Sequence, residues 1–324
     1  MDRNEIPIDR ILTMEIVRAT ERAAVAAARH RGRGNEQAAD KAAARAMLAE
    51  LNRLPVSGRI VVGEGEREET DFLYLGQAVG TGRGDEVDIA VDALEGNTLC
   101  AKNLPNALSV AAVARRGCLL ATPSAYMQKI AIGPGYAKDV IDINAAPVDN
   151  LESLAKAKGV RVSEITACIL DRPRHGRLIE AVREAGASIR LIGDGDVAGI
   201  IHAADPDETG IDIYLGSGSA AAGVLAAAAL RCMGGQMQGR LILDSLDKVE
   251  RAAKLGIADP DRVFRAEDMA RGDILFAATG VTEGSLLEGV RFRRGTVTTD
   301  SMMMRSASGT VREIKARHRV FAED

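Results

Sequence analysis

The segment that most restricts the fold is a largely apolar stretch that ends in acidic residues. It runs from Val87 to Glu95, and it carries Asp92 and Glu95, three positions apart, directly before Gly96. A short apolar run that stops at a glycine is typical of a buried strand followed by a turn. Carboxylates at the end of a buried strand need a cationic partner, because an unpaired charge is costly away from water.

A second acidic turn, residues 63–69, follows the apolar residues 59–62. Carboxylates that converge at strand ends repel one another unless a cation lies between them, and such hard oxygen ligands suit Mg²⁺ or Mn²⁺. A bound ion of this kind can hold a phosphate and activate a water molecule. We therefore predict that Glu64 joins Asp92 and Glu95 at a metal site. The other acids of the turn are expected to be solvated: Glu66, Glu68 and Glu69.

Asp40 is a further candidate ligand because of its place on a helix. The second predicted helix runs from near Asn35 to about Leu54, and Asp40 lies on the same face as the apolar Met47 and Leu51. A carboxylate on the buried face of a helix needs a partner. On spacing alone, a metal shared with the strand-end acids and an ion pair with a buried arginine satisfy that need equally well.

Charge and composition limit the classes of partner. The chain has 42 Lys and Arg against 46 Asp and Glu, and it has no Trp, so it offers neither the basic surface nor the stacking aromatics of a nucleic-acid-binding protein. The longest apolar run, residues 220–230, is too short for a membrane span. Residues 1–7 hold no apolar export segment, and four scattered cysteines suggest free thiols in the cytoplasm.

The pattern of segments predicts an α/β protein of two domains. Two helices, the acidic strands and further strands near residues 107–113 and 129–133 indicate an α+β N-terminal half with a mixed or antiparallel sheet. After a charged helix at residues 149–159, strands and helices alternate, which is typical of a parallel α/β layer. We expect domains at residues 1–155 and 156–324. Strands are also expected near the C-terminus, at residues 290–292, 296–304 and 310–314.

An arginine pair marks a candidate phosphate site in the second half. Arg172, Pro173 and Arg174 come directly after the strand predicted at residues 166–171, at the edge where α/β sheets bind ligands. Two guanidinium groups separated by one proline can hold phosphate oxygens between them. The alternative is a solvent-exposed pair of arginines beside a proline turn.

The turn Gly193–Asp196 follows the next strand. Its glycines suggest a dinucleotide-binding fingerprint, but Gly199 lies one residue too late, and two aspartates would repel a pyrophosphate. Asp194 and Asp196 are better suited to sugar hydroxyls. No Ser-His-Asp or Cys-His arrangement is evident, so a covalent protein nucleophile is not favoured.

The sequence resembles class II fructose-1,6-bisphosphatase in segments that keep one register from about residue 10 to about residue 320. The resemblance implies the layered fold of the lithium-sensitive sugar phosphatases and a Mn²⁺ or Mg²⁺ cofactor. It also implies hydrolysis of the 1-phosphate of fructose 1,6-bisphosphate, with sedoheptulose 1,7-bisphosphate as a second substrate in carbon-fixing relatives. The matching segments are Gly63–Glu66, Val91–Gly96, Ala125–Lys129, Arg172–His175, Asp194–Asp196, Asp273–Gly280 and Arg305–Arg312.

The resemblance further implies roles for individual residues. Residues 1–155 would form the metal-binding catalytic domain, and residues 156–324 would bind the sugar phosphate; we also expect a homo-oligomer, a dimer or a tetramer. Metal-activated water would replace a protein nucleophile. The metal ligands would be Asp40, Glu64, Asp92 and Glu95, and the catalytic residues Asp92, Glu95 and Asn97. The substrate would contact Glu95, Gly96, Asn97, Tyr126, Arg172, Pro173, Arg174, Asp194, Gly195, Asp196 and Ser219.

Several positions depart from the family pattern, among them Asn35, where the family commonly has an aspartate, and Ala93, where it has a proline. Asn97 replaces a threonine that orients the attacking water, Ser219 replaces a glycine beside the sugar phosphate, and Ala222 replaces a metal-ligating glutamate. Two hypotheses follow: an active sugar bisphosphatase with a weakened second metal site, or a catalytically impaired relative that binds a sugar phosphate as a regulator or sensor. The four retained carboxylates favour the enzyme, whereas Ala222 and Asn97 favour the impaired relative.

Overall fold

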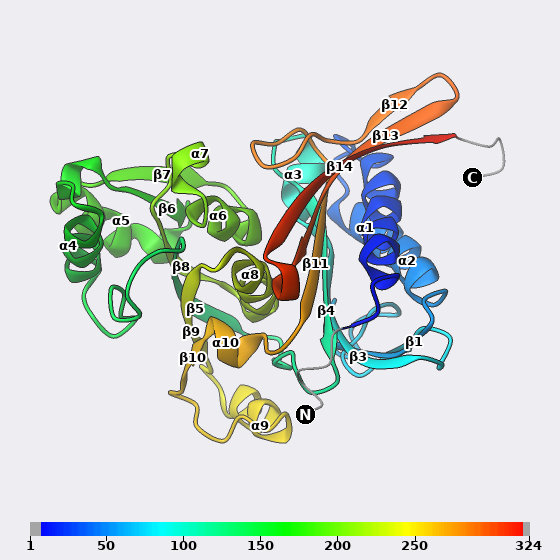
Figure 1. Cartoon of the computed structure of the whole chain (residues 1–324), viewed down its shortest axis with the longest axis horizontal. Helices are drawn as coiled ribbons and strands as arrows, with labels where there is room; N and C mark the ends of the chain where they lie inside the picture. Colours follow the sequence, from blue (N-terminus) through cyan, green and yellow to red (C-terminus); the bar gives the residue numbers. More distant parts are fainter. Residues whose placement is uncertain (1–7, 320–324) are drawn as a thin grey trace. The chain divides into compact units, whose positions relative to one another are not determined.

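The computed structural model describes residues 8–319, so the expectation of no export signal concerns a segment, residues 1–7, outside it. The chain is an α/β protein with two compact units (Figure 1). Unit 1 combines Met1–Leu120 with Arg271–Asp324, and unit 2 is the continuous stretch Ala121–Ala270. Within the described part, no helix is long and apolar enough to cross a membrane.

The sheet of unit 1 is built from both ends of the chain. Its strands are β1 (Val56–Val62), β2 (Ala78–Val79), β3 (Asp85–Glu95), β4 (Leu108–Arg115), β11 (Ile274–Gly280), β12 (Arg291–Arg293), β13 (Thr296–Arg305) and β14 (Thr310–Arg319). They lie in the order β12-β13-β11-β4-β3-β1-β2, with β14 paired along β13. β1 and β3 are parallel, and the other described pairings are antiparallel.

This pairing explains why the domain boundary differs from the one expected between residues 155 and 156. The three C-terminal strands form as predicted, but β11 pairs with β4, so the strands between residues 274 and 319 belong to the N-terminal sheet. Strand alternation predicts a strand but does not identify its neighbour, because either sheet can bury the same apolar face. The expected boundary instead follows Ala155, inside a helix of unit 2.

Two helices cover one face of the unit 1 sheet. α1 (Leu12–Ala28) and α2 (Glu36–Leu51) lie side by side there, and α3 (Asn97–Lys102) follows β3 directly (Figure 1). Their facing surfaces are rich in buried alanine, which allows the two helix axes to approach closely. The second helix starts where predicted, because the Asn35 side chain accepts a hydrogen bond from the Ala38 N–H at 3.0 Å and caps it.

Unit 2 contains a second sheet of mixed direction. Its strands are β5 (Tyr126–Ile132), β6 (Thr166–Leu170), β7 (Ser188–Ile192), β8 (Ile213–Ser219), β9 (Gln236–Ile242) and β10 (Val263–Arg265), in the order β10-β9-β5-β8-β6-β7. β7, β6 and β8 run parallel, as the alternation of strands and helices predicted. β5 and β9 run antiparallel, so the parallel layer covers only half of this sheet.

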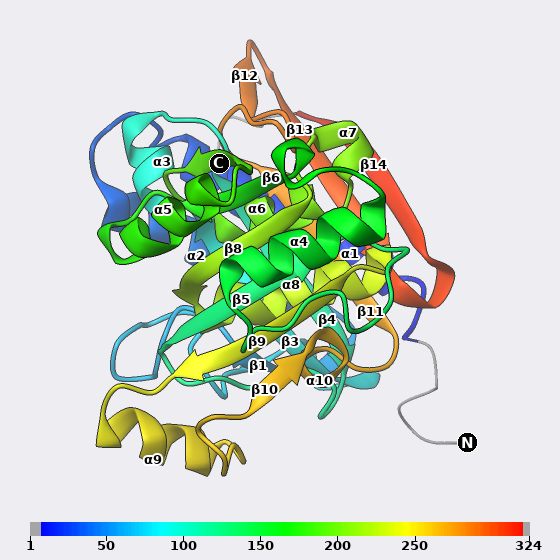
Figure 2. The same ribbon diagram turned by 90° about the vertical axis from the view of Figure 1, so that its left-hand side faces the viewer.

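Helices cover both faces of the unit 2 sheet. α4 (Pro147–Lys158) and α5 (Gly176–Glu184) lie on one face, in front of the strands in Figure 2, and α6 (Asp196–Ala203) and α8 (Ala220–Met233) lie on the other. This arrangement leaves the carboxyl ends of the three parallel strands at one edge. The remaining short elements of unit 2 are α7 (Pro206–Thr209), α9 (Leu246–Lys254), α10 (Ala266–Met269), η2 (Val162–Glu164) and η3 (Pro173–His175).

Candidate active site

The strand-end acids of unit 1 share one edge of the sheet. β1 and β3 are parallel, and Val62 is paired with Ala90, so both strands end at the same side. Glu64 comes two residues after β1, and Asp92 lies two residues after Ala90 on β3. The parallel pairing therefore gathers carboxylates that are distant in sequence, which an antiparallel pairing would have placed at opposite edges.

The end of β3 is irregular where the acids occur. Asp92 pairs with Val110 of β4 and Glu95 with Leu108, so three steps along β3 match two along β4. An extra residue of this kind re-aims the side chains that follow it. Glu95 is only 4% exposed, and Gly96, with φ at 87°, lets the chain turn straight into α3.

Glu64 lies close to two other acidic side chains, Asp92 and Asp40. Its Oε1 accepts a hydrogen bond from the Ala93 N–H at 2.8 Å. Burial, followed by repulsion from the carboxylates of Asp92 and Asp40, nevertheless raises the pKa of Glu64 well above its usual range. Repulsion among neighbouring carboxylates is what a bound cation offsets, so the charge distribution fits a divalent metal.

Asp40 has Asn97 as a hydrogen-bond partner, whereas helix spacing had allowed an ion pair with a buried arginine. Its Oδ1 accepts a long hydrogen bond, 3.4 Å, from the carboxamide of Asn97. Burial raises the pKa of Asp40, and this bond lowers it in part. Asn97 was expected to contact the substrate and to stand in for a water-orienting threonine, and it also gives Asp40 a neutral donor. The carboxamide thus reduces the cost of holding this acid near Glu64.

The side chains of residues 8–319 do not form a ready-made metal cage. As they lie, no three His, Cys, Asp or Glu side chains in that range could hold a single ion. Two of the four predicted ligands turn toward protein donors, Glu64 toward Ala93 and Asp40 toward Asn97. Each of these bonds engages one carboxylate oxygen, Glu64 Oε1 or Asp40 Oδ1, so the second oxygen of each side chain could coordinate an ion while the bond is kept.

In unit 2, three turns meet at the carboxyl ends of parallel strands. Leu170 of β6 is paired with Ile192 of β7, so the arginine turn that follows β6 lies beside the aspartate turn that follows β7. β8 is parallel to β6, and its last residues, Ser217–Ser219, reach the same edge. Tyr126 of β5 is paired with Ser219. The sheet thus brings together the substrate contacts predicted in this half of the chain.

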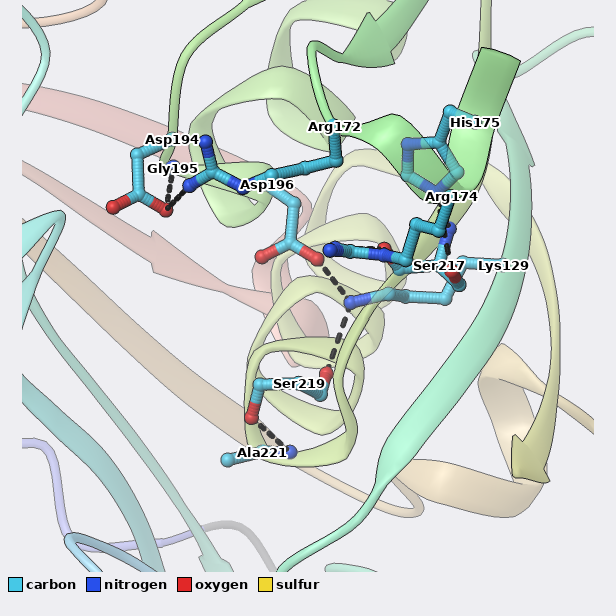
Figure 3. A network of polar contacts seen from close by, with 10 residues as sticks. All are labelled: Lys129, Arg172, Arg174, His175, Asp194, Gly195, Asp196, Ser217, Ser219 and Ala221. Carbon is cyan, nitrogen blue, oxygen red and sulfur yellow. Dashed lines mark hydrogen bonds and ion pairs between the residues drawn. The ribbon is translucent and has the colours of Figure 1, made fainter. Parts of the chain in front are cut away.

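The two arginines are held by different neighbours (Figure 3). Arg172 Nη2 lies 3.6 Å from Asp194 Oδ1. Arg174 donates from Nη2 to the Ser217 carbonyl at 2.7 Å, and its guanidinium carbon lies 4.9 Å from the centre of the Tyr126 ring. A guanidinium stacked over an aromatic ring is pre-oriented while its edge can still donate hydrogen bonds. Arg174 and Tyr126 therefore act as one positioned group.

His175 links the arginine turn to β6 and β8 through hydrogen bonds of its ring. Its Nδ1 lies 2.8 Å from the Leu170 carbonyl, and its Nε2 lies 2.9 Å from the backbone N of Ser217. The carbonyl requires a donor and the N–H requires an acceptor, so the ring is neutral and carries its proton on Nδ1. Burial lowers the pKa of His175, in agreement with this assignment. His175 ties β8 to the arginine turn, and its contacts suit positioning.

Lys129 is a residue that sequence reasoning missed. It is 1% exposed, and its ammonium group forms an ion pair with Asp196 and donates to the Ser219 carbonyl at 2.9 Å (Figure 3). Asp196 was expected to contact sugar hydroxyls, but one of its oxygens is occupied by this ammonium group instead. The signal was present, because Lys129 shares a strand face with the buried Met127 and needs a counter-ion.

Gly218 is required for this ion pair to form. A Cβ atom at position 218 would collide with the Asp196 carboxylate and would lie 3.2 Å from Lys129 Nζ. Any other residue would push the two charged groups apart. Glycine is therefore needed at position 218, because β8 approaches the buried ion pair so closely.

Ser219 and Ala222, which depart from the family pattern, both lie at the start of α8. The Ser219 hydroxyl accepts a hydrogen bond from the Ala221 N–H at 3.2 Å and caps the helix, so it is turned toward its own helix. Ala222 lies in the first turn and is 2% exposed. Its methyl group cannot coordinate an ion, so this helix end lacks the carboxylate that the family has there.

Two of the cysteines are held as thiols by their burial. Cys100, Cys118, Cys168 and Cys232 are buried and unbridged. Burial raises the pKa of Cys100 to about 11 and that of Cys168 to about 12, so both remain thiols at neutral pH.

Comparisons with known proteins give a consistent result. A family model described as bacterial fructose-1,6-bisphosphatase, glpX-encoded, matches residues 10–318. A protein of Synechococcus elongatus named D-fructose 1,6-bisphosphatase class 2/sedoheptulose 1,7-bisphosphatase is 40% identical, over 96% of this chain and 97% of that protein. A Trichodesmium erythraeum protein of the same name is 40% identical over 98% of each chain. The matches span both the carboxylate edge and the arginine turn.

Proposed function

The chain belongs to the family of bacterial, glpX-encoded fructose-1,6-bisphosphatases, and we propose that it removes the 1-phosphate of fructose 1,6-bisphosphate. Sedoheptulose 1,7-bisphosphate is proposed as a second substrate, since both named relatives carry that activity in their names. The observation that carries the proposal is the group of half-buried carboxylates around Glu64, whose mutual repulsion suits a metal ion. A regulator that only binds sugar phosphate has no use for that repulsion.

Members of this family are metal-dependent phosphatases, and we propose Mn²⁺ or Mg²⁺ for this chain. Asp40, Glu64, Asp92 and Glu95 would hold the ion, which when bound would stabilise charge on the phosphoryl group and activate a water. Asn97 keeps Asp40 in place through its carboxamide. A cytoplasmic location and assembly into a dimer or tetramer stay predictions.

The residues of unit 2 would bind the part of the substrate that does not react. We assign the uncleaved phosphate to Arg172 and Arg174, with the Tyr126 ring orienting the second guanidinium group. Asp194 is assigned to the sugar hydroxyls together with the Gly195 backbone. Asp196 is assigned a positioning role. It pairs with Lys129, whose ammonium group also donates a hydrogen bond to the Ser219 carbonyl at the start of α8.

A phosphate-release assay tests the proposed activity. Fructose 1,6-bisphosphate, sedoheptulose 1,7-bisphosphate and an inositol phosphate should be compared with Mn²⁺, with Mg²⁺ and with a chelator. We expect metal-dependent release from the two sugar bisphosphates and none from the inositol phosphate. If the chain binds fructose 6-phosphate but releases no phosphate with either metal, the impaired-relative hypothesis is correct instead.

Removal of the Arg174 side chain should weaken substrate binding. We expect Arg174→Ala to raise KM by about 10- to 100-fold, because hydrogen bonds to charged groups contribute roughly 1.5–3 kcal/mol each. Arg174→Lys should recover only part of the loss, since an ammonium group lacks the two-pronged geometry. Arg183→Ala, an exposed change on α5, is the control. An unchanged KM for Arg174→Ala would show that the phosphate binds elsewhere.

A carboxylate restored at position 222 should strengthen metal binding. We expect Ala222→Glu, combined with Asn97→Thr, to raise Mn²⁺-dependent turnover at least about tenfold, equivalent to about 1.4 kcal/mol of barrier. The two changes should not be additive, because both act on one metal-bound water. Ala222→Gln with Asn97→Thr has nearly the same shape without the charge and should gain nothing. Ordinary enzyme rates in the unmodified chain would mean that another group replaces the missing ligand.

A further inference from the structure

A cavity in unit 1 is lined by an unusual number of arginines. It has a volume of about 430 Å³ and lies among α1, the end of α2, β13 and β14. Its guanidinium groups come from Arg18, Arg22, Arg29, Arg53 and Arg319. The volume lies within the range of small-molecule sites, roughly 300–1,000 Å³. None of these residues belongs to the proposed catalytic site.

The arginines gather because of how the elements are spaced. Arg18 and Arg22 lie on α1, and Arg29 directly follows it as its C-cap. The intervals of four and seven place all three on the same side of the helix. Arg53 follows α2, which packs beside α1, and Arg319 ends β14. Elements from both ends of the chain thus aim cationic side chains at one space.

The acids in the same cavity are already engaged. Glu50 Oε1 lies 2.9 Å from Arg53 and 3.6 Å from Arg22, so one carboxylate serves two guanidinium groups. Glu21 is buried, accepts a hydrogen bond from the Thr299 hydroxyl at 2.8 Å, and lies 3.6 Å from His318 Nε2. Arg18 also pairs with Glu15 at 2.8 Å, so the five arginines meet three carboxylates and keep an excess of two positive charges.

We propose that this cavity binds a small phosphorylated anion. The chain as a whole carries a net charge of −4, so a local excess of positive charge is concentrated here against the overall balance. Converging guanidinium groups match the tetrahedral oxygens of a phosphate, to which each can donate two hydrogen bonds. Val25 and Val297 also line the cavity and provide apolar contact for the carbon part of a phosphate ester.

Pyrophosphate binding to the full chain tests the proposal by calorimetry, with a chelator present to keep metal out. Arg174→Ala serves as the background, because it removes the arginine assigned to substrate phosphate. We expect pyrophosphate to bind this background with measurable affinity, and Arg22→Gln with Arg29→Gln to weaken that binding at least about tenfold. Exposed charge changes of this kind alter stability little, so the variants should fold. Arg22→Gln with Arg29→Gln in a chain that keeps Arg174 should also keep its bisphosphatase activity.

Two controls distinguish phosphate binding in this cavity from a general attraction of anions to the surface. Arg293→Gln with Arg294→Gln, on exposed arginines of the β12–β13 turn, should leave pyrophosphate binding unchanged. Citrate should bind more weakly than pyrophosphate if phosphate geometry matters.

Two results would overturn the proposal. One is an unchanged pyrophosphate affinity in the Arg22→Gln, Arg29→Gln variant. The other is a change in the oligomeric state of that variant without a change in affinity, because the cavity would then be a contact between copies of the chain. Absence of bisphosphatase activity in the unmodified chain would count against the proposed function alone, since the calorimetry measures binding without catalysis.

Discussion

Glu64→Gln is expected to abolish most of the bisphosphatase activity and at the same time to stabilise the metal-free protein. A lost metal ligand should lower kcat/KM at least about a thousandfold, roughly 4 kcal/mol, since the ion contributes several kcal/mol of charge stabilisation. Stability should rise because glutamine removes the charge that Asp92 and Asp40 repel. The side-chain carbonyl oxygen of the glutamine can still accept the hydrogen bond from the Ala93 N–H.

The stabilisation should depend on pH in a definite direction. The pKa of Glu64 is raised in the folded state, so the folded protein holds this proton more tightly than the unfolded chain does. Metal-free stability should therefore fall as pH rises above the ordinary glutamate range, and Glu64→Gln should lack that part of the fall. Chemical unfolding with a chelator, repeated across pH, measures the difference.

Glu68→Gln is the matched control, because Glu68 is exposed in the same acidic turn. It should change neither activity nor stability appreciably, since isolated surface charges contribute little. If Glu64→Gln kept wild-type activity, Glu64 would not be a metal ligand. If it were less stable than the wild type with a chelator present, the account of repulsion at this edge would be wrong.

Lys129→Met is expected to destabilise the protein by about 3–5 kcal/mol, the usual cost of leaving one partner of a buried ion pair alone. Lys129 is enclosed, and its removal would strand the Asp196 carboxylate and leave the Ser219 carbonyl without its donor. A loss of this size is a large part of a typical total stability of roughly 5–15 kcal/mol. Denaturant unfolding of the full chain measures it.

A second change distinguishes the stranded charge from simple loss of packing. Asp196→Asn in the Lys129→Met background should recover part of the stability, because the remaining group is then neutral. Lys156→Met, on the exposed side of α4, should have little effect. A loss below about 1 kcal/mol in Lys129→Met would mean that the pair contributes no more than a surface salt bridge. In that case Lys129 would not hold the start of α8.

Local patterns predicted the separate parts of the chain well. The apolar period of α1 and α2, the Asn35 cap and the three C-terminal strands are present where the sequence indicated them. Each depends on residues within a few positions of one another. The acids at the ends of β1 and β3 could be selected in the same way, because a charge at the end of an apolar run is visible locally.

Local patterns do not predict which distant segments pair. The domain boundary was misplaced because β11 pairs with β4 across about 160 residues, and no local period records which strand becomes a neighbour. The ion pair of Asp196 was not foreseen, because its partner Lys129 lies 67 positions earlier. The arginine cavity depends on α1 meeting the last described strand, β14.

By itself, then, the sequence determined the elements of this protein, the chemistry of its acids and arginines, and through resemblance its family. The tertiary structure decided which of these groups meet. Side-chain periodicity reports only which face of an element is buried, whereas the partner across that face is chosen by packing and charge compensation over the whole chain. The parallel pairing of β1 with β3, and the ion pair of Lys129 with Asp196, are choices of that kind.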